Sequence, residues 1–431
     1  MFLKRLNFLL PCALLGVFIV SGCAIYKTSE TATPVVLPPL ENVSPRQSAL
    51  FPESVPNWDK PVAKSAFKPL AGNERLLQSI RLNVHSQGLH SWTSLETPLR
   101  RSLEYVCSQP PKKRALTANG VSLSWEQVRR SIEELLGLLP RLDREPELLG
   151  QRFMWFGLNP GPVMTGYFTP EIEASLTKRP GYNYPIYGVP KDLRWRKIKG
   201  STHSRYYRVE NGRILPYYDR RALDVDHVLA GRGCEIAWAR DPIDVFYLQV
   251  EGCGRLRLPD GSVRNVLYGA KNGHPFKSLG LILHEKGYLP AHRLGKEDVR
   301  ACLRKHPDKA FRLMAENRSY VFFRLAEAPP EGAMGKPLTP MVSIATDRRV
   351  LPLGSVLAFD AEIPEQTVRN GVRGKRRVTG IGLAQDTGTA IRGAHVDYYV
   401  GEGYKVEPVA SRIRTKVALY LLVSKDALKN G

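Results

Sequence analysis

Three segments carry most of the information about the architecture of this chain: ATDRRVLPLGS at 345–355, AQDTGTAIRG at 384–393 and HVDYYVGEG at 395–403. Short alternating runs around them predict strands at 341–346, 356–359, 377–381 and 395–400, and an apolar segment closes the chain at 417–423. Asp386 and Asp397 lie 11 positions apart, with Gly388 and Gly393 between them. This spacing allows two short strands to bring both carboxyls to one site.

Asp397 has the sequence environment of a general acid. It is flanked by Val396, Tyr398 and Tyr399, and apolar surroundings disfavour the charged form of a carboxyl and so raise its pKa. The alternative is that Asp386 only caps a turn and that Asp397 is an exposed strand residue. Spacing alone leaves both interpretations open.

The composition points to a polyanionic partner. The 431 residues include 63 Lys and Arg against 41 Asp and Glu, a net charge of +22. With 43% hydrophobic residues the chain has ample material for a core, which excludes wholesale disorder, and its length suits two or three domains. A surplus of this size is typical of proteins that meet nucleic acid, an anionic membrane surface or an acidic polymer.

The amino terminus resembles a bacterial lipoprotein signal. Residues 1–22 combine Lys4 and Arg5 with an apolar run that Pro11 interrupts, and Val20 to Cys23 resemble a lipobox. This resemblance implies lipidation of Cys23 in a Gram-negative envelope, and Ala24 favours sorting to the outer membrane, on its periplasmic face. Only two positive charges lie in the signal, so the surplus belongs to the exported protein.

Between the signal and the β-rich half, the chain predicts a linker and packing helices. Eight prolines lie between residues 31 and 70, as in an extended, semi-rigid spacer. Helical periodicity follows over 73–139, where Leu76, Leu77 and Ile80 form a stripe and Ser124 with Gln127 forms a capping box. Further on, 245–250 (VFYLQV) and 255–258 resemble strands, and 274–325 predicts a helical interlude that includes 278–286 and 296–315.

Several functional classes lack their motifs. No HExxH, GxSxG, P-loop or Rossmann fingerprint occurs, and the histidines are scattered singly. No cysteine pair has CxxC spacing, so neither a metal nor a cofactor is expected; a Cys234–Cys253 disulfide and free buried thiols both stay open. Basic and aromatic residues alternate at 194–199 (RWRKIK), as on single-strand nucleic-acid platforms, but an exported protein does not meet genomic DNA.

Several blocks of the sequence resemble those of a known family. The three opening segments resemble the three-aspartate domain and supply Asp347, Asp386 and Asp397. Upstream blocks resemble those of membrane-bound lytic murein transglycosylase A, in the same order: TGYFTPEIEAS (165–175), YPIYGVP (184–190), FYLQVEGCGRLRLPDG (246–261), YGAKNGHPFKSLG (268–280), NRSYVFF (317–323) and PLTPMVSIATD (337–347).

This resemblance implies a mainly β fold with flanking α-helices, in which a double-psi β-barrel carries an inserted smaller β domain and a glycan groove lies between them. The implied segments are the signal at 1–22, the linker at 23–70, helices and the first part of the barrel at 71–170, the insert at 171–270, and the rest of the barrel at 271–431, with the three-aspartate region at 337–410. The implied activity is non-hydrolytic cleavage of peptidoglycan between N-acetylmuramic acid and N-acetylglucosamine, which forms 1,6-anhydro-muropeptides.

The resemblance also assigns residues. Asp397 would be the catalytic acid and then base, and Asp386 would support it. Sugar contacts would come from residues in the barrel and the insert, namely Thr165, Tyr167, Gln249, Gly252, Lys271, Asn272 and Asp347. The implied partners are glycan strands and, through its lipid, the outer membrane; binding to murein synthases stays open. A lipoprotein that binds peptidoglycan without catalysis is the competing interpretation, and a glycan hydrolase is another.

Overall fold

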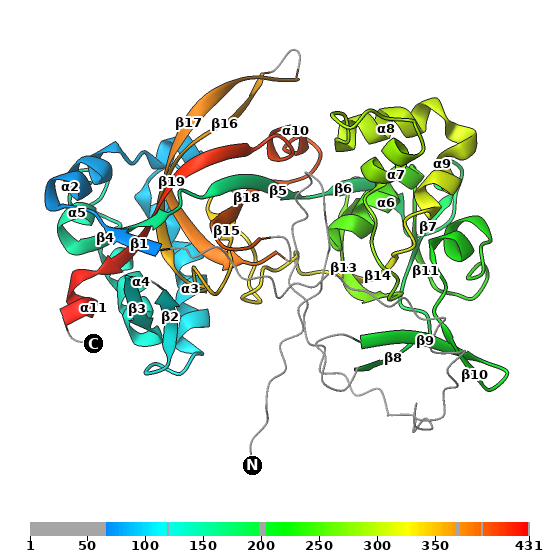
Figure 1. Ribbon diagram of the computed structural model, residues 1–431, viewed down its shortest axis with the longest axis horizontal. Coiled ribbons are helices and arrows are strands. Elements are labelled where there is room, and N and C mark those ends of the chain that lie inside the picture. The colour runs from blue at the N-terminus through cyan, green and yellow to red at the C-terminus, as the bar shows by residue number, and fades with distance from the viewer. Residues whose placement is uncertain (1–65, 119, 198–203, 368–370, 389–390, 430–431) are drawn as a thin grey trace. The chain divides into compact units, whose positions relative to one another are not determined.

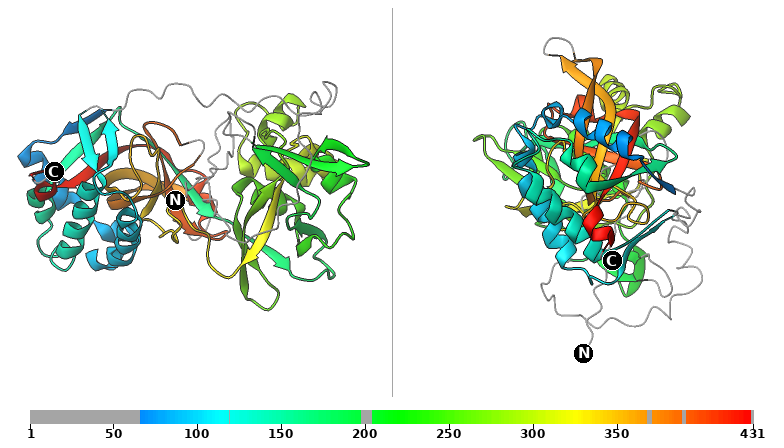
Figure 2. Two further views of the ribbon diagram at one scale, coloured as in Figure 1. Left: turned by 90° about the horizontal axis from the view of Figure 1, so that it is seen from below. Right: turned by 90° about the vertical axis from the view of Figure 1, so that its left-hand side faces the viewer.

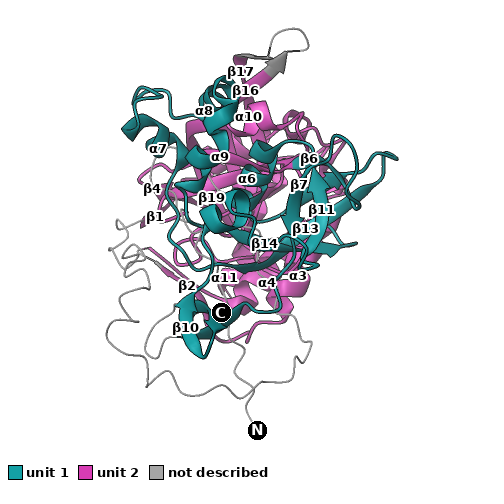
Figure 3. Ribbon diagram, turned by 90° about the vertical axis from the view of Figure 1, so that its right-hand side faces the viewer, with its two compact units in different colours: residues 1–18, 25–59, 171–329 teal, residues 19–24, 60–170, 330–431 magenta. Residues whose placement is uncertain are grey.

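A computed structural model describes residues 66–118, 120–197, 204–367, 371–388 and 391–429. The predicted signal, the lipidation site Cys23 and nearly all of the linker lie outside these residues. The described chain divides into two compact units (Figure 3): a barrel unit of residues 66–170 and 330–429, and an insert unit of residues 171–329. Each unit is described by itself.

The barrel unit contains a closed ring of six strands. Its sheet has the order β1-β4-β19-β16-β17-β15-β18-β5, and an additional pairing of β19 with β5 closes the ring from β19 to β5. The strands are β1 (Ala66–Pro69), β4 (Phe153–Asn159), β5 (Val163–Thr169), β15 (Ser343–Ala345), β16 (Val356–Thr367), β17 (Gly371–Asp386), β18 (His395–Glu402) and β19 (Arg414–Ser424). The prediction of a mainly β fold with a barrel and flanking helices is therefore confirmed; the double-psi crossing stays a prediction.

The pairing of β16 with β19 forms a buried apolar part of the ring. Leu357, Ala358 and Phe359 of β16 are fully buried, as are Leu421 and Leu422 of β19, which pairs with β16. β16 and β17 continue beyond the ring as a long hairpin (Figure 1). The strands predicted at 341–346, 356–359, 377–381 and 395–400 are all present, and β16 and β17 are much longer than the apolar runs that predicted them.

The remaining elements of this unit are mostly helices, and the blue and cyan ones gather beside the barrel strands (Figure 2). They are α2 (Gly72–Arg81), η2 (Val84–Gln87), η3 (Trp92–Leu95), α3 (Glu96–Cys107), α4 (Trp125–Leu138), α5 (Leu148–Arg152), α10 (Glu407–Ala410) and α11 (Lys425–Lys429), with the small hairpin of β2 (Arg114–Ala118) and β3 (Val121–Ser124). The capping box is confirmed at the start of α4, where the Gln127 amide donates to Ser124 Oγ and the Ser124 amide donates to Gln127 Oε1. The β2–β3 hairpin was not predicted.

The stripe on α2 does not pack as predicted. Leu76, Leu77 and Ile80 are 37%, 54% and 58% exposed. The helix instead approaches α5 by its backbone, since a Cβ on Gly150 would lie only 2.9 Å from the carbonyl oxygen of Arg75. Because Gly150 of α5 has no side chain, α2 can pack closely on α5. The side of α2 that carries Leu77 and Ile80 then faces solvent.

The insert unit consists of two sheets and a helical cluster. A six-stranded sheet has the order β14-β13-β12-β6-β11-β7, and a three-stranded sheet has the order β10-β9-β8. The strands are β6 (Glu171–Ser175), β7 (Tyr184–Tyr187), β8 (Arg194–Lys197), β9 (Ser204–Glu210), β10 (Arg213–Pro216), β11 (Glu235–Ala239), β12 (Gly254–Arg257), β13 (Val263–Lys271) and β14 (Val321–Ala326). The helices are η4 (Arg221–Val225), α6 (Pro242–Glu251), α7 (Leu279–Glu285), α8 (Lys296–Lys305) and α9 (Pro307–Ala315).

The boundary of this unit differs from the predicted one. The sequence predicted that the barrel resumes at residue 271, whereas contacts keep residues 271–329 within the insert unit. The reason is packing: Leu283, Leu303 and Leu313 of α7, α8 and α9 share a buried core with Phe246 of α6. β14 also pairs with β13, so the end of the predicted helical interlude is a strand.

The predicted strand at 245–250 is wrong, because these residues lie in α6. The Asp241 side chain accepts a hydrogen bond from the amide of Ile243, Pro242 occupies the first turn, and Gly252 ends the helix in the left-handed conformation with φ of 81°. These are strong start and stop signals for a helix. They outweigh the strand preference of the aromatic and branched residues between them.

Two further features bear on earlier expectations. Cys107, Cys234 and Cys302 carry free thiols, so the suggested Cys234–Cys253 disulfide is not formed. Among the described residues, no helix combines the length and apolar character needed to cross a bilayer.

Candidate active site

Four neighbouring strands of the barrel place a row of side chains side by side. In the register, Thr165 of β5 lies opposite Asp397 of β18, Asp397 lies opposite Ala345 of β15, and Ala345 lies opposite Asp386 of β17. Directly opposed residues on neighbouring strands point to the same face of a sheet. Strand β15 lies between the strands of Asp386 and Asp397, and its residue in this row is the small Ala345. The two carboxyls therefore lie close together, as their spacing predicted.

Asp386 is fully buried and hydrogen-bonded on both oxygens. Its Oδ1 accepts from the amides of Ala333 at 2.9 Å and Thr387 at 2.8 Å, and its Oδ2 accepts from the Tyr167 hydroxyl at 2.9 Å. Burial raises the pKa of Asp386 to about 7, although these hydrogen bonds act to lower it. The carboxyl thus exchanges its proton near neutral pH.

Asp397 is also fully buried, so it is not an exposed strand residue. The Thr165 hydroxyl donates to Asp397 Oδ1 at 2.9 Å and lies 2.8 Å from Nε2 of His395. A hydroxyl has one proton to give. Because Thr165 gives it to Asp397, Nε2 of His395 carries the proton donated to Thr165. The chain His395–Thr165–Asp397 therefore holds one carboxyl oxygen in place.

His395 is a site residue that the sequence reasoning missed. A signal for it was present, because it lies two positions before Asp397 on one strand, and residues at i and i+2 of a strand point to the same face. Scattered single histidines were treated as surface or packing residues, and this one is half-buried beside the carboxyl.

Tyr167 links the two carboxyls electrostatically. Burial, and then the negative charges of Asp386 and Asp397, raise the pKa of Tyr167 well above its ordinary value, so its hydroxyl stays a donor. Its ring lies 5.1 Å from the ring of Tyr399, in a small buried cluster with Ala345 and Ile391. The predicted sugar contact of Tyr167 stays a prediction; in the structure the ring packs and the hydroxyl binds Asp386.

Asp347 supports the segment that follows Asp386. Arg349 binds both of its oxygens, at 3.0 and 2.8 Å, and the Gly393 amide donates to Oδ2 at 2.9 Å. Burial would raise the pKa of Asp347, but the hydrogen bonds from Arg349 and Gly393 outweigh it and lower the pKa. Asp347 thus stays ionised. Its bond to Gly393 joins the start of the 345–355 segment to the end of the 384–393 segment.

The other predicted sugar contacts lie in the insert unit. Asn272 is 1% exposed and makes four hydrogen bonds within its unit: its amide donates to the carbonyls of Tyr218 and Arg318, and its oxygen accepts from the amides of His274 and Tyr320. This network holds the loop around Asn272, and its predicted sugar contact stays a prediction.

Gln249 is likewise buried. Its Oε1 accepts from Arg220, whose guanidinium lies between the rings of Phe246 and Tyr320, 4.6 and 4.9 Å from their centres. Gly252 ends α6, as described above. Lys271 is half-buried, with its ammonium 5.6 Å from the centre of the Tyr206 ring.

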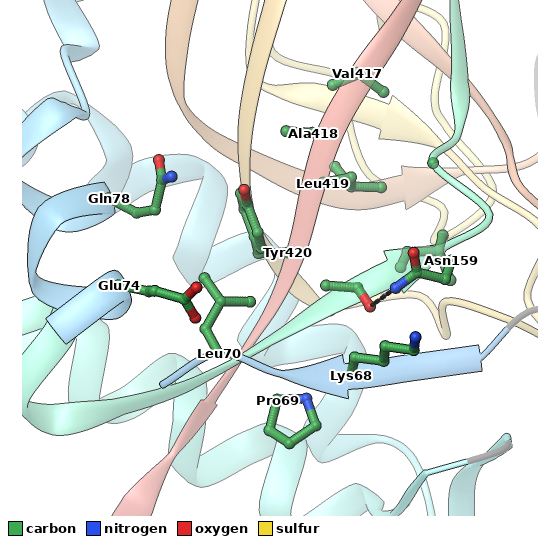
Figure 4. A pocket seen from close by; sticks show the side chains of 13 residues that line it. Lys68, Pro69, Leu70, Glu74, Gln78, Asn159, Val417, Ala418, Leu419 and Tyr420 are labelled. Carbon is green, nitrogen blue, oxygen red and sulfur yellow. Dashed lines mark hydrogen bonds between the residues drawn. The ribbon is translucent and has the colours of Figure 1, made fainter. Parts of the chain in front are cut away.

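A separate pocket in the barrel unit contains none of the predicted site residues. It has a volume of about 440 Å³ and lies between α2 and strands β1, β4 and β19, where Lys68, Glu74 and Tyr420 face it (Figure 4). Within the described residues, no group of three or more His, Cys, Asp and Glu side chains could hold a metal ion.

Comparison with known proteins places both units. Residues 163–324 match the family described as the MltA-specific insert domain, and residues 342–423 match the 3D domain. The insert match, like the contact boundary, extends well beyond the predicted residue 270.

Relatives and solved structures agree. The chain is 30% identical over 244 residues to a membrane-bound lytic murein transglycosylase A of Vibrio cholerae, covering 56% of this chain and 60% of the relative. It is 31% identical over 242 residues to that of Escherichia coli K12, covering 56% and 59%. The chain thus spans about three fifths of the curated relatives it matches. A membrane-bound lytic murein transglycosylase structure from Agrobacterium tumefaciens superposes with a TM-score of 0.63 at 27% identity, covering 84% of this chain and 99% of that one.

Fold, site and comparisons define a class of two-unit proteins in which an MltA-specific insert interrupts a barrel that carries the three aspartates of a 3D domain. Within that class, the chain is similar to the membrane-bound lytic murein transglycosylases A.

Proposed function

We propose that this chain is a peptidoglycan lytic transglycosylase. The observation that carries the proposal is the row Thr165–Asp397–Ala345–Asp386, which places two buried carboxyls on one face of the barrel. Similarity to relatives that are named lytic murein transglycosylases supports the choice of reaction. The reaction is cleavage between N-acetylmuramic acid and N-acetylglucosamine with formation of a 1,6-anhydro ring.

Asp397 acts first as acid and then as base. It protonates the glycosidic oxygen, and the resulting carboxylate takes the proton from the 6-hydroxyl of the muramic acid as that hydroxyl attacks the anomeric carbon. Thr165 holds Oδ1, so the transferable proton lies on Oδ2. The nucleophile belongs to the substrate, and its proximity replaces an activated water.

Asp386 supports this chemistry by being only partly ionised. With its pKa near 7, it adds less negative charge beside Asp397 at neutral pH than an ordinary aspartate would. Repulsion between two ionised carboxyls would otherwise oppose formation of the Asp397 carboxylate. Both side chains are fully buried in the structure, so the proposed reaction requires the site to open to the glycan.

A glycan substrate agrees with one structural relative. The crystal structure of E. coli MltA with bound chitohexaose has the same fold, with a TM-score of 0.53 at 22% identity. By analogy we assign this chain a β-1,4-linked amino-sugar polymer. The proposal keeps all the predicted sugar contacts, namely Thr165, Tyr167, Gln249, Gly252, Lys271, Asn272 and Asp347.

We also propose a lipid anchor at Cys23 in the outer membrane. The lipobox-like segment supports it, and the curated relatives are named membrane-bound. Labelling of cells with a radioactive fatty acid tests it: the wild type should incorporate label, and Cys23→Ser should not.

Digestion of purified sacculi tests the activity. The wild type should release anhydro-muropeptides, which are lighter by one water than hydrolysed products. Asp397→Asn should lower the rate by at least about 10² to 10⁴-fold while sacculi still bind. Asp360→Asn, on the same barrel, is the matched control. Hydrolysed products would support a hydrolase instead, and an unaffected Asp397→Asn rate would overturn the assignment of the acid.

A further inference from the structure

One face of β19 leads from the carboxyl site to the pocket shown in Figure 4. Arg414, at the start of β19, lies opposite Thr165 of β5, and Thr165 lies opposite Asp397 of β18. Opposed residues on neighbouring strands point to the same face of a sheet. The row of the two carboxyls therefore extends by one strand, to Arg414. Further along β19, Tyr420 lines the pocket.

The side chains between these two points share that face. Because side chains alternate along a strand, Arg414, Lys416 and Tyr420 lie on one side, here called the β19 strip. Burial follows the alternation, since Val417 and Leu419 are buried and Lys416 is exposed. Among the described residues, neither Arg414 nor Lys416 forms a salt bridge with a carboxylate. The β19 strip thus places two cations between the carboxyl site and the pocket.

The pocket is built around a glycine. Lys68 of β1 and Tyr420 of β19 both lie opposite Gly157 of β4, so the three residues share one face. A Cβ on Gly157 would lie 3.6 to 3.7 Å from atoms of Leu70, Lys68 and Tyr420. The space that a larger side chain would fill belongs to the pocket of about 440 Å³. The absence of a side chain at Gly157 therefore opens the floor between an ammonium and a phenol.

Polar side chains of opposite charge lie around this floor (Figure 4). Within the described chain, Lys68 forms no salt bridge and Gln78 of α2 forms no side-chain hydrogen bond. Glu74 of α2 accepts a hydrogen bond from the Ala71 amide with one oxygen, at 2.9 Å, and its other oxygen has no partner among the described residues. An ammonium and a carboxylate thus line one pocket without pairing with each other. This arrangement fits a ligand group that carries both charges.

We infer that the β19 strip and the pocket bind the stem peptide of peptidoglycan, an inference that rests on the proposed function for the choice of polymer. A stem peptide starts at the muramic acid beside the bond that is cut. It carries free carboxylates, which match Arg414 and Lys416, and a diaminopimelate end group with an ammonium and a carboxylate, which matches Glu74 and Lys68.

The length of the peptide agrees with the spacing on β19. The pocket begins at Val417, three residues and roughly 10 Å along the strand from Arg414. A tetrapeptide reaches at most roughly 14 Å, so a peptide that starts beside Arg414 is long enough to enter the pocket. The sugars of a glycan strand bear hydroxyls and acetamido groups but no ammonium for Glu74, so the pocket favours the peptide over the glycan.

Titration calorimetry of the full mature chain with the soluble tetrapeptide L-Ala–γ-D-Glu–diaminopimelate–D-Ala tests the inference. Lys68→Gln and Lys416→Gln should each weaken binding about fivefold, as expected for loss of a partly exposed ion pair, and the effect should disappear at high salt. Gly157→Leu should abolish binding, because the strand has room for a Cβ and the rest of the side chain would fill the pocket.

Two variants of the same unit are matched controls. Lys112→Gln removes an exposed positive charge outside the pocket. Gly137→Leu adds the same side chain as Gly157→Leu at an exposed position of α4, where a Cβ meets nothing within 4 Å. Both should bind the tetrapeptide as the wild type does. Lys68→Gln changes an exposed side chain, so it keeps the test valid if Gly157→Leu does not fold.

Three results would overturn the inference. The first is tetrapeptide binding by Lys68→Gln and Gly157→Leu equal to that of the controls. The second is binding of free diaminopimelate as tight as that of the tetrapeptide, without an effect of Lys416→Gln, which would indicate a site for a free amino acid. The third is a loss of chitohexaose binding in Gly157→Leu without a loss of tetrapeptide binding, which would indicate a site for the glycan.

Peptide binding is measured without any reaction, which separates this inference from the proposed function. If the wild type binds the tetrapeptide through Lys68 but releases no anhydro product from sacculi, the proposed function fails and the peptide site stands. If the wild type releases anhydro product but does not bind the tetrapeptide, the peptide site fails and the proposed function stands.

Discussion

Replacement of Asp386 by asparagine should remove part of the fall in the free energy of unfolding that occurs as the pH rises. Asp386 Oδ1 accepts two amide hydrogen bonds and Oδ2 faces the Tyr167 hydroxyl. Oδ2 accepts from Tyr167 in the structure. An asparagine can keep the two accepted bonds with its oxygen, while the Tyr167 hydroxyl turns to accept from the new amide. Asp386→Asn is therefore a neutral side chain of nearly the same shape that cannot ionise, and it should fold.

The magnitude follows from the pKa. Burial raises the pKa of Asp386 from 3.8 to about 7, and each pKa unit corresponds to about 1.36 kcal/mol. The folded chain therefore holds a proton that the unfolded chain has already released. The stability from this group is fully present below pH 3.8 and is lost as the pH rises through 7, about 4 kcal/mol in all. Between pH 5 and pH 8 the loss is about 2.5 kcal/mol.

Urea unfolding followed by tryptophan emission at pH 5 and pH 8 measures this loss. The free energy of unfolding of the wild type should fall about 2.5 kcal/mol further between the two pH values than that of Asp386→Asn. Asp360→Asn, which removes a carboxyl that pairs with Arg377 on the barrel surface, should keep the wild-type difference. An equal pH difference in wild type and Asp386→Asn would refute the assignment of a neutral, buried Asp386.

Three further outcomes are expected. Thr165→Val should lower turnover and cost about 1.5 to 3 kcal/mol of stability, because a buried carboxyl loses its donor; Thr165→Ser should restore both in activity and melting assays. His395→Ala should lower kcat with little change in KM, since the histidine acts through Thr165, whereas His90→Ala, at an exposed position, should leave both constants unchanged. Ser124→Ala should lower the free energy of unfolding by about 1 kcal/mol through loss of the α4 cap, without altering turnover.

Sequence was a reliable guide where local pattern and tertiary packing agree. The strands around Asp347, Asp386 and Asp397 were predicted because apolar runs, glycines and carboxyls alternate there with strand periodicity. The convergence of Asp386 and Asp397 followed from the same pattern. The partner strand β5, which supplies Thr165, could be assigned to this site only by family resemblance, since no local pattern links residues 232 positions apart.

Predictions from the sequence were wrong where a helix cap or a contact with another helix determines the local structure. The run at 245–250 was assigned by composition, although Asp241, Pro242 and Gly252 mark the ends of a helix. The exposure of Leu77 depends on how α2 meets Gly150, which periodicity does not reveal.

The pairing of β5 with β18 and β19 has a consequence for when the protein becomes active. Thr165 precedes Asp397 by 232 residues, which a ribosome adds in roughly 10 to 50 seconds at common rates. The whole insert unit emerges during this interval and can fold first. β5 cannot pair until β18 and β19 have been synthesised. A nascent chain, or one truncated before these strands, therefore has no assembled carboxyl pair. A chain of this design cannot carry out the proposed reaction until β18 and β19 have been synthesised.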